Sequence, residues 1–240
     1  MARDTGLMER ARVSGESVFT VYDWANPTLS FGRNQEAKGR YDLASIRQRG
    51  VDVVRRPTGG RALLHHREVT YSVTAPIQPS ESLAESYHRI NRVLIAGLGK
   101  LGVIAMESQS TAPSPAPGTL PCFAAPANGE LVTGGAKLVG SAQVREAGAL
   151  LQHGSILLAD DQAMIADLMI GQPSEVVPPA ATLAAATGRT PTISEVAEAL
   201  FAALAEVEST TPVALEEADT TSFTAPHLAH YESELWTWRR

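Results

Sequence analysis

Apolar and polar positions follow two periods along the chain. A period of two, or a short apolar run, predicts eight strands. They cover residues 18–22, 29–32, 51–54, 62–65, 69–75, 130–133, 137–144 and 149–158. We expect 62–65 and 69–75 to pair with each other. We also expect 130–133 and 137–144 to form a hairpin around its two glycines.

Capping signals predict three short helices. Residues 1–13 carry apolar side chains on one side, and Gly15 ends the segment. Asp42 is a suitable N-cap for a two-turn helix that Gly50 ends. The acidic pair at 160–161 is best interpreted as the start of another short helix.

Two longer helices begin at capping boxes, at 82–85 and at 192–195. Apolar side chains then recur at steps of three and four, which places them on one face of each helix. In the first helix we expect the glycines at 97, 99 and 102 to close it. The apolar positions of that helix are Leu83, Tyr87, Ile90, Leu94, Leu98 and Leu101.

Mixed strands and helices with several hairpins predict an α+β fold around one sheet. The chain has no internal repeat and no clear boundary, so we expect a single domain over residues 1–240. The segment 111–118 is rich in proline and is a loop by composition. It is interpreted as an internal loop or as a linker.

Composition narrows the class of protein. The chain has 240 residues, 44% apolar and 19% charged, which is enough apolar content for a core. A net charge of −6 argues against a general nucleic-acid binder. One cysteine excludes a disulfide framework and a multi-cysteine metal site. Because there is neither a membrane-length apolar run nor the apolar core of a secretory signal, we expect a cytoplasmic protein.

An arginine-rich turn follows the strand at 51–54. Arg55, Arg56 and Arg61 lie within seven residues, and Gly59 and Gly60 let the backbone approach a ligand closely. The segment is not a phosphate-binding P-loop. From these residues alone, a surface hairpin with solvated arginines stays open beside an anion site.

Two further positions carry possible chemistry. Lys137 is on a predicted strand with Val139, Ser141 and Gln143 on the same face, and it either faces inward and needs a partner or lies on an exposed edge. Cys122 is a nucleophile activated by that ammonium or a small buried apolar residue.

Histidines leave more than one interpretation. His153 is interpreted as a base, a polar anchor or a core side chain held by the backbone, and His65 and His66 have no nearby group that suggests a metal site. The GxSxG turn of serine hydrolases is absent.

The order of these segments resembles the biotin and lipoate A/B protein ligase family. Arg55-Arg-Pro-Thr-Gly-Gly-Arg-Ala-Leu-Leu-His65 is similar to the family signature RRxSGGxAxxH. Lys137-Leu-Val-Gly-Ser-Ala-Gln143, followed by Leu151-Gln-His-Gly-Ser-Ile-Leu-Leu158, resembles its KxxGSAQ and HHGTLL block. The match spans nearly the whole chain. The resemblance implies a class II synthetase-like domain with a central mixed, largely antiparallel sheet flanked by helices. Compared with the family, either the usual first strand is missing here or the start of the chain is assigned too late.

Within the family, the cysteine before the lysine resembles the LipM-type octanoyltransferases. That resemblance implies transfer of an octanoyl group in lipoate biosynthesis, through a thioester on Cys122, with Lys137 favouring the thiolate and positioning the acyl carbonyl. The donor would be octanoyl-acyl carrier protein, whose acidic surface the arginines could meet. The implied substrate-binding residues are Arg56, Thr58, Gly59, Gly60, His65, Gly140, Ser141, Ala142, His153 and Gly154.

The implied acceptor is a lysine of a lipoyl domain, in the glycine cleavage H protein or in acyltransferase subunits of 2-oxo-acid dehydrogenases. No nucleic acid, membrane, metal or cofactor is expected for this reaction. Two other functions stay open. An ATP-dependent lipoate ligase would need ATP and Mg2+ and would usually carry an accessory domain, and a non-catalytic module would only bind acyl groups or carrier proteins.

Overall fold

The computed structural model describes residues 1–110, 122–123, 125–171 and 178–240. The proline-rich segment 111–118 therefore lies outside the described residues. In chain order the elements are α1 (Ala2–Ser14), β1 (Val18–Tyr22), β2 (Thr28–Phe31), α2 (Leu43–Gln48), β3 (Asp52–Arg55), β4 (Leu63–His65), β5 (Glu68–Pro76), α3 (Leu83–Lys100), β6 (Met106–Glu107), β7 (Leu131–Thr133), β8 (Ala136–Glu146), β9 (Ala149–Leu157), the 3-10 helix η1 (Gln162–Leu168), α4 (Leu183–Thr187), α5 (Ile193–Val207), α6 (Glu217–Glu232) and α7 (Glu234–Thr237).

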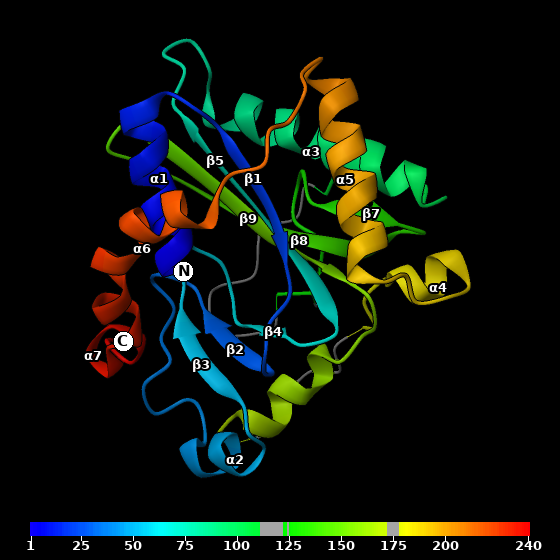
Figure 1. Cartoon of the computed structure of the whole chain (residues 1–240). Helices are drawn as coiled ribbons and strands as arrows, with labels where there is room; N and C mark the ends of the chain where they lie inside the picture. Colours follow the sequence, from blue (N-terminus) through cyan, green and yellow to red (C-terminus); the bar gives the residue numbers. More distant parts are fainter. Residues whose placement is uncertain (111–121, 124, 172–177) are drawn as a thin grey trace.

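These strands form two sheets (Figure 1). The large sheet has the order β1-β5-β9-β8-β7-β6, and all its pairs are antiparallel. The small sheet has the order β3-β2-β4, with β2 parallel to β3 and antiparallel to β4. The α+β prediction is confirmed, but the expectation of one sheet is wrong, because β2, β3 and β4 pair in a sheet of their own.

Helices cover both faces of the large sheet (Figure 1). α3 and α5 bury Ile90, Leu94 and Leu200 against one face. On the other face α1 places Met8 and Ala11 against β9. Among the described residues, no helix combines the length and apolar character needed to cross a bilayer.

Local signals located most elements correctly. Asp42 caps α2, both capping boxes are formed, and Gly15 ends α1 in a left-handed conformation. The predicted β7–β8 hairpin is also formed. The pairing predicted between 62–65 and 69–75 is wrong, because β4 pairs with β2 in the small sheet whereas β5 lies between β1 and β9.

The expectation that glycines close α3 is only partly correct. Gly102 follows the helix, but Gly97 and Gly99 lie within it. A Cβ at Gly97 would lie 2.7 Å from Leu200 Cδ2 and 3.1 Å from Leu200 Cα. This glycine therefore permits close packing of α3 against α5 instead of ending the helix.

Candidate active site

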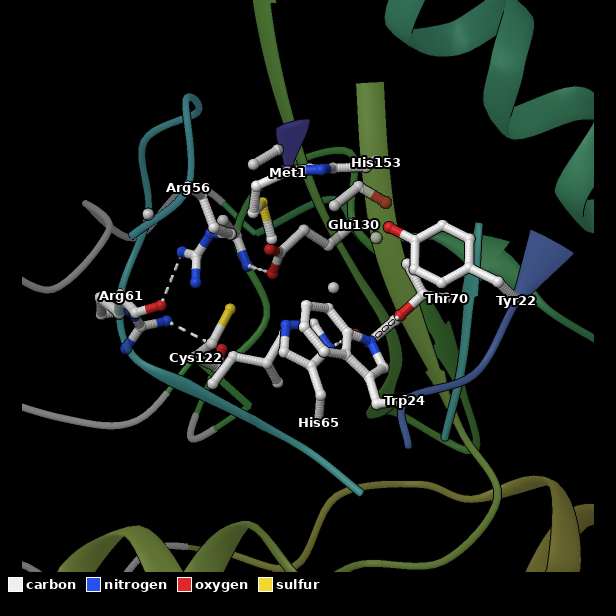
Figure 2. A pocket seen from close by; sticks show the side chains of 18 residues that line it. Met1, Tyr22, Trp24, Arg56, Arg61, His65, Thr70, Cys122, Glu130 and His153 are labelled. Carbon is white, nitrogen blue, oxygen red and sulfur yellow. Dashed lines mark hydrogen bonds between the residues drawn. The ribbon is translucent and has the colours of Figure 1, made fainter. Parts of the chain in front are cut away.

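A cavity of about 400 Å³ lies where the two sheets meet (Figure 2). β8 and β9 of the large sheet form one wall, and the segment from β3 through β4 forms another. Its lining is Met1, Tyr22, Trp24, Arg56, Gly60, Arg61, Leu63, His65, Thr70, Cys122, Ala127, Glu130, Gly140, Ser141, Ala142, His153, Gly154 and Ser155. It combines apolar side chains with a thiol, a carboxylate and two imidazoles.

Cys122 lies at the cavity next to the ammonium of Lys137. Lys137 Nζ is 3.4 Å from Cys122 Sγ and donates to Cys122 O at 2.8 Å. The backbone N–H of Cys122 donates to Ala62 O at 2.9 Å, next to β4. The nucleophile is thus attached to the small sheet, whereas Lys137 belongs to β8 of the large sheet.

A bulge in β8 turns Lys137 toward the cavity. Leu131 pairs with Val139, but Val132 pairs with Lys137, so one extra residue of β8 lies between these pairs. The lysine side chain consequently lies over Gly140, where an added Cβ would be 3.1 Å from Lys137 Cε. The prediction that Lys137 shares a face with Ser141 is therefore wrong, although its burial against a partner is correct.

Glu130 is that partner, and the sequence analysis missed it. Its Oε1 lies 2.7 Å from Lys137 Nζ, and its Oε2 accepts from the Ala127 backbone N–H at 2.7 Å. The lysine side chain is 0% exposed and the glutamate 10%, so this ion pair is buried. The Phe123 ring lies 4.9 Å from the ammonium and adds a cation–π contact. The available signal was a carboxylate on the opposite arm of the predicted hairpin.

All three arginines of the turn are buried, so the interpretation as solvated surface residues is wrong. Arg56 Nη1 donates to Ser30 O and Ser30 Oγ, and Nη2 donates to Gly59 O and Arg61 O. Arg61 Nη2 donates to Cys122 O at 3.1 Å. Burial lowers the pKa of Arg56, while Cys122 acts in the opposite direction. These guanidinium groups hold loops together, so they do not form a surface for an acidic partner.

His65 is fixed by contacts at both ring nitrogens. Its Nδ1 lies 3.1 Å from Glu68 Oε1, and its Nε2 lies 2.9 Å from Ser30 Oγ. Trp24 stacks on the imidazole with a centroid separation of 4.3 Å and donates from Nε1 to Thr70 Oγ1 (Figure 2). With both nitrogens engaged, His65 forms a rigid wall of the cavity.

His153 is also engaged at both nitrogens, by side chains and not by the backbone. Its Nδ1 lies 3.1 Å from Asp4 Oδ2, and its Nε2 lies 2.6 Å from Thr58 Oγ1. Burial lowers the pKa of His153, although Asp4 acts in the opposite direction. In the neutral ring Nδ1–H donates to the carboxylate and Nε2 accepts from the Thr58 hydroxyl. His153 therefore joins the arginine turn to β9.

Two glycines keep the cavity wall thin. A Cβ at Gly154 would lie 2.5 Å from Gly140 O and 2.8 Å from Tyr71 Cε1. At Gly140 it would meet both Lys137 and the Phe123 ring, at 3.1 and 3.2 Å. Side chains here would displace the lysine or the neighbouring strand.

The structure places nine of the predicted site residues on the cavity. They are Arg56, Gly60, His65, Cys122, Gly140, Ser141, Ala142, His153 and Gly154. Lys137 is behind Cys122, Thr58 is buried against His153, and Gly59 is exposed. Besides Glu130, the sequence analysis missed the stacked Trp24. It named Arg61 as part of the arginine turn but did not predict its contact with Cys122 O. Within the described part of the chain, no group of three or more His, Cys, Asp or Glu side chains could hold a metal.

Comparison with known proteins gives a consistent picture. Residues 1–205 match the family model described as lipoyl protein ligase A/B catalytic domain. "Octanoyltransferase LipM" of Kyrpidia tusciae is 44% identical over 178 residues, which are 70% of the chain and 65% of that relative. The chain thus spans slightly less than two thirds of that relative in this match. "Octanoyltransferase LipM" of Symbiobacterium thermophilum is 36% identical over 257 residues, covering 100% of the chain and 93% of the relative.

A solved structure shares the fold. The crystal structure of lipoate-protein ligase A bound with ATP superposes with a TM-score of 0.78. It covers 99% of the chain and 92% of the other protein, at 20% sequence identity. At that identity the likeness concerns the fold alone.

Proposed function

The chain belongs to the lipoyl protein ligase A/B catalytic-domain family, and from this membership we propose that it is an octanoyltransferase of lipoate biosynthesis. In this reaction an octanoyl group passes from acyl carrier protein to Cys122 and then to a lysine of a lipoyl domain. The observation that carries the proposal is the contact of 3.4 Å between Cys122 Sγ and Lys137 Nζ at the cavity.

The first half-reaction is a thioester exchange. The Cys122 thiolate attacks the carbonyl carbon of the donor thioester, a C–S bond to Cys122 forms, and the bond to the carrier sulfur breaks. The carrier sulfur leaves as a thiolate and takes a proton from solvent, so Lys137 keeps its own. An ammonium next to Sγ favours the thiolate, which is the nucleophilic form. Because one thioester replaces another, the step is close to isoenergetic and needs no ATP.

The second half-reaction makes an amide. The neutral ε-amine of the acceptor lysine attacks the Cys122 thioester, a C–N bond forms, the C–S bond breaks, and the attacking nitrogen releases one proton to solvent. Amide formation from a thioester is downhill, and the Lys137 ammonium is placed to donate to the departing sulfur. Tyr22, Trp24 and Leu63 supply apolar surface for the acyl chain within the cavity.

The partners in this proposal are acylated acyl carrier protein and lipoyl domains of the glycine cleavage H protein or 2-oxo-acid dehydrogenase acyltransferase subunits. We place the reaction in the cytoplasm, and no cofactor takes part. The curated relatives named octanoyltransferase support the reaction class.

The test is intact-mass measurement after mixing the protein with octanoyl-acyl carrier protein in the absence of ATP. We expect one octanoyl adduct that hydroxylamine removes, and none on Cys122→Ala. If lipoyl-domain modification required free lipoate and ATP, and Cys122→Ala retained it, the protein would be a ligase. Acyl binding without turnover would instead indicate a binding module.

A further inference from the structure

We propose that Glu130 keeps the amine of Lys137 protonated so that the acyl group on Cys122 cannot pass to the enzyme's own lysine. The proposal rests on the proposed function, because it concerns the acyl-thioester formed on Cys122. It assigns Glu130 as a positioning residue that acts through Lys137.

The hazard follows from the geometry that assists catalysis. Lys137 Nζ is 3.4 Å from Cys122 Sγ. In the acyl-enzyme the carbonyl carbon would be bonded to that sulfur, so the amine and the carbonyl group would be held next to each other. Intramolecular reactions in such arrangements reach effective molarities of about 10⁵–10⁸ M. A neutral Lys137 amine would therefore compete strongly with an acceptor lysine that arrives from solution.

The side reaction is balanced without any further reagent. The Nζ lone pair attacks the thioester carbonyl, a C–N bond forms, and the C–S bond breaks. The Cys122 sulfur leaves and takes the proton released from Nζ. The product has a free thiol and an octanoyl amide on Lys137. Because the amide is more stable than the thioester, the modification would inactivate the protein permanently.

The contacts of Lys137 prevent this step. An ammonium has three N–H donors and no lone pair. Nζ has three hydrogen-bond partners among the described residues: Glu130 Oε1 at 2.7 Å, Cys122 O at 2.8 Å and Cys122 Sγ at 3.4 Å. With all three hydrogens engaged, Nζ is a donor toward the sulfur and not a nucleophile.

Glu130 supplies the charge that this state requires. A lysine that is 0% exposed favours the neutral amine unless an anion compensates it. Among the described residues, only Glu130 has a carboxylate within ion-pair distance of Lys137. It is also the only acidic residue among the described residues that line the cavity. The Ala127 backbone N–H holds its second oxygen at 2.7 Å, so the carboxylate is fixed in place. Phe123 and Cys122 O add dipolar contacts but no negative charge.

The experiment replaces Glu130 by Gln and follows where octanoyl goes. Wild type and Glu130→Gln are loaded with octanoyl-acyl carrier protein without an acceptor, treated with hydroxylamine, and mapped by peptide mass spectrometry. We expect hydroxylamine-resistant octanoyl on Lys137 in the variant, at least about tenfold above wild type, because the buried amine then lacks the anion that compensates its charge. Acceptor turnover should decline over successive cycles as the amide accumulates.

Two controls match the variant. Glu107 lies in β6, and its side-chain oxygens contact His88 and Asn91. Glu107→Gln removes this carboxylate and should leave Lys137 unmodified. Glu130→Gln combined with Lys137→Arg lacks the amine and should give no resistant adduct at position 137.

The outcomes separate the two proposals. Absence of a thioester on wild type would refute the proposed function itself. A thioester on both proteins with no excess of amide on Glu130→Gln would refute only the role of Glu130. A folded variant that forms neither adduct would also refute it, since Glu130 would then act in the acylation step. If Glu130→Gln does not fold, Glu130→Asp decides, because its shorter carboxylate should give intermediate amide formation, and amide at the wild-type level would overturn the proposal.

Discussion

Arg55 offers a direct test of whether the arginine turn is structural or forms a docking surface. Its Nε donates to Trp236 O and Thr237 O at 3.2 and 2.9 Å. Its Nη1 donates to Gly32 O and Gln35 O, both at 2.7 Å. One guanidinium thus joins the C-terminal α7 to the loop after β2. Burial lowers the pKa of Arg55 to about 10, and neighbouring arginines act in the same direction.

The perturbation is Arg55→Lys, which keeps the charge but replaces a planar fork by a point donor. If the lysine satisfies two of these four carbonyls, two charged hydrogen bonds are lost, each contributing about 1.5–3 kcal/mol. We expect a decrease of about 3–6 kcal/mol in the free energy of unfolding. For a chain of this size that corresponds to a melting temperature lower by roughly 10 °C.

The assay is thermal unfolding followed by circular dichroism, together with limited proteolysis of the C-terminal segment. Arg40→Lys is the matched control, because Arg40 is exposed and forms a single ion pair with Glu36. That control should change stability by less than about 1 kcal/mol. If Arg55→Lys and the control had the same melting temperature while the KM of Arg55→Lys for the carrier protein rose, the structural interpretation would be refuted. The arginine turn would then be interpreted as a docking surface for the carrier protein.

Two further predictions concern the site. Gly154→Ala places a Cβ 2.5 Å from Gly140 O, so we expect the free energy of unfolding to fall by about 2–3 kcal/mol and thioester formation to be lost. Gly99→Ala has open space around the added Cβ and should be neutral or stabilising in the same denaturant titration. Equal free energies of unfolding for the two variants would contradict the close approach of β8 and β9. Burial lowers the pKa of His153, so its stabilisation is fully present above the unfolded value of about 6.5 and decreases as pH falls below it. His153→Gln should reduce the dependence of unfolding free energy on pH just below 6.5, by up to about 1.4 kcal/mol per unit, and an unchanged slope would rule out this residue as its source.

Local features of the fold could be predicted because their causes lie within a few residues. The capping boxes at Ser82 and Thr192, and the glycine hairpin between β7 and β8, depend on near neighbours. The strands were located for the same reason. The partner of β4 could not be predicted, because period-two patterning marks a strand without identifying the strand beside it.

The sequence predicted only those site residues that belong to a recognisable motif. Resemblance brought Cys122 and Lys137 together, and the structure places them in contact. The burial of Arg56 was hidden because its partners are mainly backbone carbonyls, which every residue carries. The contact between Asp4 and His153 joins positions 149 residues apart and has no local signal.

The division of the reactive pair between two sheets has a consequence for motion. The amide of Cys122 is bonded to Ala62 O beside β4, whereas Lys137 is anchored in β8. A small separation of the sheets would break the sulfur–ammonium contact and part the small cluster of Leu63 and Leu157, while the larger core of each sheet stayed intact. This opening should therefore need less free energy than global unfolding. The reactivity of Cys122 therefore depends on how closely the two sheets pack against each other.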